Sequence, residues 1–141
     1  MQIKKILILI NGDEVDEESI NLICKLENLY SCEIYAVYVI IVPLTIPIDT
    51  ELIVETARAQ KILEEASIKA KAQSCIVQRI VLKTRAAGPA IIKIIEEYNI
   101  DMVLIGIKYA TRFGQFSLGN IAPHILKNAS CQVLLYQLHA A

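Results

Sequence analysis

Residues 3–12, IKKILILING, form a run of aliphatic side chains that stops at Asn11 and Gly12. A strand covered on both faces has this near-continuous apolar pattern, whereas a strand with one face in water alternates. Five acidic residues lie within positions 13–18, where they suit the start of a helix, and apolar residues then recur at helical spacing up to position 29. We therefore expect a buried strand that passes directly into a helix.

The same alternation continues to the end of the chain. Further strand-like runs occupy residues 33–42, 74–83, 101–106 and 131–136. Further helical patterns occupy residues 50–73, 87–98 and 120–127. Strands that alternate with helices form a parallel sheet with helices on both faces. We therefore expect an α/β fold, a three-layer, doubly wound sheet of five parallel strands, whose fourth strand ends on Gly106.

Length and composition indicate one globular domain over residues 1–141. Of the 141 residues, 55% are hydrophobic, which is enough to bury a single core. The formal net charge is -1 with both signs interspersed, which argues against a nucleic-acid partner. The longest uncharged stretch, residues 34–48, contains two prolines and is shorter than the about 20 apolar residues of a membrane-spanning helix. We expect a cytoplasmic protein without membrane insertion.

Few residues suggest catalysis or metal binding. Four cysteines are spread along the chain: Cys24, Cys32, Cys75 and Cys131. They form no C-x-x-C pair, so we expect free, mostly buried thiols and no zinc site. The acidic residues 13–18 read as a solvated first helical turn rather than a metal site. His124 lies in a predicted helix, and neither a G-x-S-x-G elbow nor a G-x-G-x-x-G fingerprint occurs. We assign no catalytic residue and no metal ligand.

Two unusual loops follow predicted strands at their carboxyl ends, where ligands bind in folds of this class. Residues 11–13 follow the first strand, and a glycine-bearing loop after Gly106 leads to Gly119 and Asn120. The second loop ends at a predicted helix start, whose backbone N–H groups attract anions, and it contains the cation Arg112. If the first and fourth strands are neighbours, both loops line one crevice.

A plainer interpretation of this loop also stays open. Gly106 and Gly119 can simply end one element and begin the next, and Arg112 can be a solvated cation. Residues 114–120 have the glycine spacing of a Walker A loop, but Asn120 stands at the lysine position. We therefore do not assign a Walker A site.

The whole chain resembles the universal stress protein family. The segments that carry the resemblance are ILILING (6–12), AGPAII (87–92), DMVLIG (101–106), LGN (118–120) and LKNASCQVL (126–134). Residues 112–116 resemble a subset with Arg-Phe-Gly-x-Phe before the last glycine, whose members occur alone or appended to amino-acid transporters. The resemblance implies the strand order 3-2-1-4-5, as in adenine nucleotide alpha hydrolase-like and flavodoxin-like folds, and a regulatory role in the stress response.

ATP-binding members of that family carry Gly-x2-Gly-x9-Gly-Ser/Thr and an aspartate after the first strand. By position, Gly106 and Gly119 keep the first and last glycines. Tyr109, Asn120 and Asn11 stand where the family has a glycine, a serine or threonine, and the aspartate. Tyr109 adds bulk where a phosphate would approach, and Asn11 can hydrogen-bond a ribose or base without supplying charge.

The resemblance implies an adenine nucleotide of the ATP, ADP or AMP type as ligand, at the carboxyl ends of the first and fourth strands. The candidate binding residues are Asn11, Gly12, Val39, Ile41, Gly106, Tyr109, Arg112, Gly119 and Asn120. The base and ribose would lie against the first two strands, and the phosphates at Gly106, Gly119 and Asn120. Because the chain offers no general base there, slow ATP hydrolysis is the most chemistry we expect.

A second hypothesis is a nucleotide-independent, dimeric interaction or signalling module with a degenerate pocket. It is motivated by the altered motif and by the high apolar content. The resemblance also implies a homodimer through the last strand, between Gln132 and Tyr136, because an edge strand needs covering. A further protein partner or a transporter remains open under either hypothesis.

Overall fold

The computed structural model describes residues 2–109 and 121–139, in which strands and helices alternate as the sequence predicts. The strands are β1 (Lys5–Leu9), β2 (Glu33–Ile41), β3 (Val77–Thr84), β4 (Met102–Tyr109) and β5 (Gln132–His139). The helices are α1 (Val15–Tyr30), α2 (Ile53–Lys71), α3 (Ala87–Glu97) and α4 (Ile121–Asn128).

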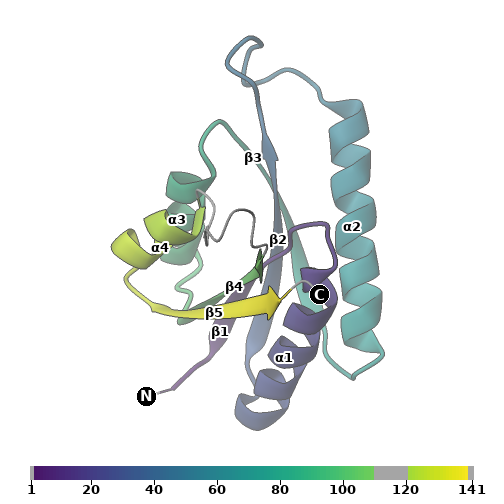
Figure 1. Cartoon of the computed structure of the whole chain (residues 1–141), viewed down its shortest axis with the longest axis vertical. Helices are drawn as coiled ribbons and strands as arrows, with labels where there is room; N and C mark the ends of the chain where they lie inside the picture. The colour runs from purple at the N-terminus through teal and green to yellow at the C-terminus, as the bar shows by residue number, and fades with distance from the viewer. Residues whose placement is uncertain (1, 110–120, 140–141) are drawn as a thin grey trace.

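The strands form a five-stranded sheet in the order β3-β2-β1-β4-β5, and every pair is parallel. β1 is therefore central, with Ile6 opposite Ile34 of β2 and Met102 of β4. The predicted fold class and strand order are confirmed. Because all strands point the same way, their carboxyl ends meet at one edge of the sheet (Figure 1).

The side chains of β1 explain its continuous apolar run. Ile6, Ile8 and Ile10 pack into a buried cluster with α1 and α2. Leu7 and Leu9 pack into a second cluster with α3 and α4 on the opposite face. The two helix pairs cover the two faces of the sheet (Figure 1). A central strand between two such layers is apolar on both faces, here from Ile6 to Leu9.

Each helix buries one stripe of side chains, as a surface helix of a layered fold does. In α2 the buried residues are Ala59, Leu63, Ala66 and Ala70, spaced by three or four positions. Within residues 2–109 and 121–139, no helix combines the length and the apolar character that crossing a bilayer requires.

The prediction that the fourth strand ends on Gly106 is wrong. β4 continues to Tyr109, and its partner β5 continues past the predicted end to His139. Ile107 still packs against the cluster that α3 and α4 form, so burial extends the strand beyond the glycine. Gly106 therefore does not end the strand, and the requirement for glycine at this position comes from packing.

Candidate functional site

Asp16 shapes the turn that follows β1. Its carboxylate accepts hydrogen bonds of 2.8 Å from the backbone N–H groups of Asn11 and Gly12. Burial raises the pKa of the Asp16 carboxyl, against the opposite effect of these hydrogen bonds. Gly12 has a φ of 81°, in the left-handed region that favours glycine. Asp16 is only 8% exposed, so the expectation of a solvated acidic turn is wrong at this residue.

Asn11 follows the carboxyl end of β1 and contacts Gly106 inside β4. Its side-chain Nδ2 donates a hydrogen bond of 2.7 Å to the carbonyl oxygen of Gly106. The two strands are neighbours, and these two candidate residues lie together at the sheet edge. An aspartate carboxylate cannot donate a hydrogen bond to that carbonyl, so this contact favours asparagine at position 11.

Gly106 lies in β4 directly against α1. A Cβ at this position would collide with the Oγ of Ser19 and come within 3.2 Å of Val15 Cγ2. Ser19 is fully buried, and within the described residues its Oγ has no hydrogen-bond partner. Glycine is therefore required at this position because α1 lies so close to the sheet. Neither of the roles predicted for Gly106, ending the strand and binding the nucleotide, included this contact.

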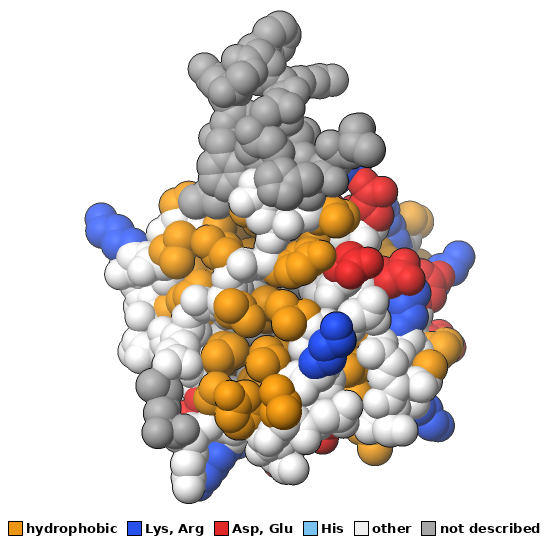
Figure 2. All heavy atoms as spheres, turned by 60° about the horizontal axis from the view of Figure 1, so that its bottom comes forward, with side chains coloured by type: hydrophobic (Ala, Val, Ile, Leu, Met, Phe, Trp, Pro, Cys, Tyr) orange, Lys and Arg blue, Asp and Glu red, His pale blue; other side chains and the backbone are white. Residues whose placement is uncertain are grey.

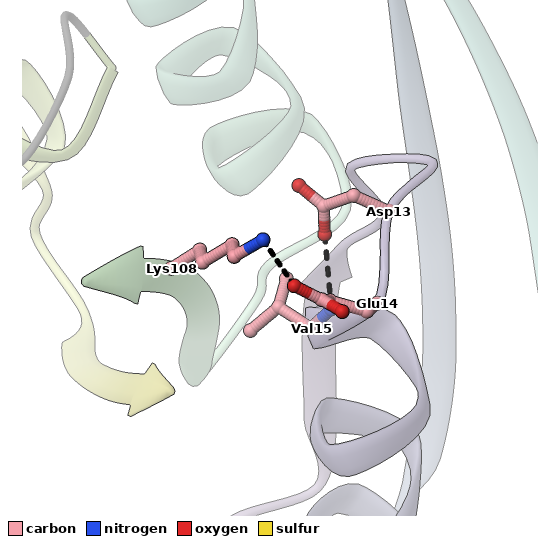
Figure 3. Close-up of polar contacts among 4 residues, drawn as sticks. All are labelled: Asp13, Glu14, Val15 and Lys108. Carbon is pink, nitrogen blue, oxygen red and sulfur yellow. Dashed lines mark hydrogen bonds and ion pairs between the residues drawn. The ribbon is translucent and has the colours of Figure 1, made fainter. Parts of the chain in front are cut away.

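An ion pair connects β4 to the start of α1 on the same side of the sheet. Lys108 contacts the carboxylate of Glu14, and the neighbouring Asp13 carboxylate accepts the N–H of Val15 at 3.0 Å (Figure 3). The carboxylate of Glu14 raises the pKa of the Lys108 ammonium. Together with Ser19 and Gly106, this pair fastens β4 to α1 on the face away from α3 and α4.

Val39 and Ile41, the candidate binding residues of β2, lie on the side of the sheet that α3 and α4 cover. Val39 packs against the buried cluster of α3 and α4, and Ile41 is 52% exposed at the end of β2. Ile41 lines a cavity of about 540 Å³ at the carboxyl edge of the sheet. The other described residues that line it are Arg85, Ala86, Ala87, Gly88, Pro89, Ile121 and His124. Its volume falls in the range of about 300–1,000 Å³ that small-molecule sites have.

Arg85 and His124 line this cavity but are absent from the predicted binding set. Arg85 follows β3 at the same edge as Asn11, so the rule that ligands bind at carboxyl ends also applied to this loop. His124 packs on α3, where a Cβ on Gly88 would lie 2.7 Å from its Cγ and Cδ2. The sequence shows a histidine in a helix but gives no sign of the glycine that it packs against.

The remaining candidates do not all join this cavity. A Cβ at Gly12 would lie 3.0 Å from Ile62 of α2, so Gly12 faces the α2 side of the sheet. Tyr109 continues the backbone of β4 opposite His139, and its side chain lies outside what the structure describes. Three predicted residues lie outside the described residues altogether: Arg112, Gly119 and Asn120.

The thiols are free, and three of the four are buried: Cys24, Cys32 and Cys75. Burial raises the pKa of Cys75 to about 12, with a smaller contribution from the neighbouring Cys24, so this thiol is protonated at neutral pH. Among the residues that the structure describes, no three His, Cys, Asp or Glu side chains are grouped to hold a metal ion.

Comparison with known proteins places the chain in a protein class. The model of the universal stress protein family matches residues 2–137. The chain belongs to this family. Universal stress protein MJ0531 of Methanocaldococcus jannaschii is 26% identical over 138 residues, which cover 94% of this chain and 81% of that protein.

Two solved structures share the fold. A universal stress protein from Archaeoglobus fulgidus in complex with dAMP superimposes with a TM-score of 0.74, at 16% identity, over 96% of this chain and 98% of that one. A universal stress protein in complex with cAMP superimposes with a TM-score of 0.74, at 13% identity, over 97% of this chain and 98% of that one.

Proposed function

We propose that this protein binds an adenine nucleotide at the carboxyl edge of its sheet and acts as a regulatory protein in the stress response. Two solved structures of the same fold are complexes with dAMP and cAMP, which share an adenine base, a sugar and one phosphate. Their low identity to this chain transfers the fold alone, so the proposal depends on this chain's own residues.

The observation that carries the proposal is the cavity that joins Ile41 to Ile121. Ile41 belongs to the candidate set for the base, and Ile121 directly follows Asn120, a candidate for the phosphates. A cavity lined by one candidate residue and by the neighbour in sequence of another supports the proposal of a single site. Its lining is largely apolar with one guanidinium, a composition that suits a flat base and an anionic group.

Each part of the nucleotide has a proposed contact. The adenine packs against the apolar side chain of Ile41 beside Val39. The amide of Asn11 donates from Nδ2 to Gly106, which leaves its Oδ1 as an acceptor for a ribose hydroxyl. The phosphates lie toward Gly119 and Asn120, with Arg112 as a partner.

The proposal is tested by calorimetry with ATP, AMP and cAMP on the wild type and on Ile41→Glu. The carboxylate would face the base and repel the phosphate, so we expect the affinity to fall about tenfold or more, that is by about 1.4 kcal/mol per decade. Ile76→Glu is the matched control, because Ile76 is 82% exposed just before β3, at the opposite edge of the sheet. It should bind like the wild type.

Two outcomes would contradict this proposal. If the wild type gives no binding heat with any of the three nucleotides at millimolar concentration, the nucleotide-independent interaction module is favoured instead. If both variants bind like the wild type, a nucleotide binds but not in the cavity beside Ile41.

We also propose that a second copy of the chain covers β5. Within the described part of the sheet, β5 pairs on one side only, with β4. Its apolar residues are half-buried rather than buried: Val133, Leu134, Leu135, Tyr136 and Leu138. Hydrophobic side chains form a continuous patch in the view that brings the lower part of Figure 1 forward (Figure 2). Pairing of two such edges would remove an exposed template for aggregation.

A further inference from the structure

Two basic residues at the end of β3 hold the loop between β2 and α2, residues 42–52. The guanidinium of Arg85 donates to the carbonyl oxygens of Pro43 at 2.7 Å and Ile46 at 2.8 Å. The ammonium of Lys83 donates to the carbonyl of Thr50. The loop projects beyond the carboxyl edge of the sheet, between β2 and α2 (Figure 1).

Beyond Val42, which is buried and whose N–H donates to the Thr84 carbonyl, the side chains of the loop are mostly exposed. Leu44 is 87% exposed and Ile48 is 46% exposed, and residues 42–48 carry no charged side chain. Hydrogen bonds from the guanidinium to two carbonyls three residues apart therefore hold the backbone of this segment. Arg85 acts as a clamp on the first half of the loop.

The same Arg85 lines the cavity that contains Ile41. Among the described lining residues it is the one Lys, Arg, Asp or Glu side chain. The bonds to Pro43 and Ile46 use two of its five N–H groups. Carbonyl oxygens do not neutralise the positive charge, whereas a phosphate does and can accept two parallel N–H bonds.

We propose that Arg85 couples the occupancy of this cavity to the order of the β2–α2 loop. A phosphate group of the bound nucleotide accepts the guanidinium N–H groups that the loop leaves free, while the carbonyls of Pro43 and Ile46 keep theirs. The ligand thereby tightens the clamp, and the ordered loop holds Arg85 in place for the ligand. This inference rests on the proposed function, since it names the anion that the cavity receives.

The coupling is reciprocal, as any equilibrium between two linked sites must be. A ligand that stabilises the clamped loop binds more weakly when the clamp is removed, by the same factor. The outward side chains of Leu44 and Ile48 lie on this loop, so their presentation at the surface depends on the ligand.

The test is hydrogen exchange of the full chain, with and without AMP, on the wild type, Arg85→Gln and Arg85→Lys. In the wild type, AMP should slow exchange of the loop amides between Leu44 and Thr50 several-fold. In Arg85→Gln these amides should exchange faster without ligand, and AMP should not slow them. Arg85→Lys keeps the charge but lacks the planar fork, so it should bind AMP without protecting the loop.

Arg79→Gln is the control, because Arg79 is an exposed arginine of β3 outside the lining of the cavity. It should behave as the wild type. If calorimetry shows that the wild type binds AMP but AMP protects the loop equally in Arg85→Gln, or accelerates its exchange in the wild type, the coupling is overturned and the proposed function stands.

If the wild type binds neither AMP nor ATP, the proposed function fails. The coupling then fails with it, unless inorganic phosphate alone protects the loop in the wild type and not in Arg85→Gln. That result would keep Arg85 as an anion-dependent clamp and reject the nucleotide.

Discussion

Asn11 illustrates how one residue serves the fold and the proposed ligand. Its backbone N–H is bound by Asp16, and its side-chain amide is bound to Gly106. Both contacts fix the amide just after β1 ends, beside Gly106 of β4. The sequence placed Asn11 correctly at a strand end, but the hydrogen bond that favours asparagine there depends on a carbonyl 95 residues away.

We predict that Asn11→Asp lowers the free energy of unfolding by about 1–2 kcal/mol, because it leaves the Gly106 carbonyl without its donor and adds a charge beside Asp16. Urea denaturation at neutral pH measures this change. Asn28→Asp on the exposed surface of α1 is the control and should change stability little. A stability of Asn11→Asp equal to that of the wild type would show that the side-chain bond contributes nothing.

At the scale of elements, the close contact of α3 and α4 depends on Gly88. The imidazole of His124 lies where a Cβ on Gly88 would be, at 2.7 Å from two ring atoms. This contact sets the distance between two helix starts that line the same cavity. Any side chain at Gly88 must therefore move α4 or displace His124.

Gly88→Ala should cost about 1–3 kcal/mol of stability, the usual effect of overpacking. In the double variant Gly88→Ala/His124→Ala the imidazole ring is gone, but the Cβ at position 124 remains 3.0 Å from the new methyl group, so the cost of the glycine change should fall without vanishing. The coupling energy from a double-mutant cycle in urea measures this. Additive effects of the two substitutions would mean that the helices do not meet at this contact.

The element boundaries show where sequence reasoning stops. Apolar periodicity predicted every strand and helix, because burial on two faces leaves a strong pattern in β1 and its neighbours. It ended β4 and β5 too early. For β4 the reason is that a glycine inside a strand looks the same as a glycine that ends one; β5 was ended at Tyr136, although it continues to His139. Gly106 is explained by Ser19 on α1, a contact between distant positions that no local pattern contains.

For the whole molecule, the parallel sheet brings loops from the first, second and third strands to one edge. The order β3-β2-β1-β4-β5 also leaves β3 and β5 at the two sides of the sheet. The predicted topology was correct, and it was sufficient to bring Asn11 to Gly106. It was not sufficient to find Arg85, because the role of Arg85 depends on the path of the β2–α2 loop.

We predict that static light scattering at micromolar concentration gives twice the 15.7 kDa mass of the chain. Leu138→Lys should shift the protein to the monomer, because it places a charge on β5 at a half-buried residue outside the two buried clusters. Leu126→Lys is the control: Leu126 is 46% exposed on α4, and the variant should remain a dimer. A monomeric wild type would refute assembly through β5.

The central claim is that the cavity between Ile41 and Ile121 receives an adenine nucleotide. The most direct measurement is a titration of the isotope-labelled protein with AMP, followed by the amide chemical shifts in NMR. We expect saturable shifts that concentrate at residues 11, 41, 85–88, 121–122 and 124. Shifts that concentrate elsewhere on the fold, or no shifts at millimolar AMP, would contradict the account.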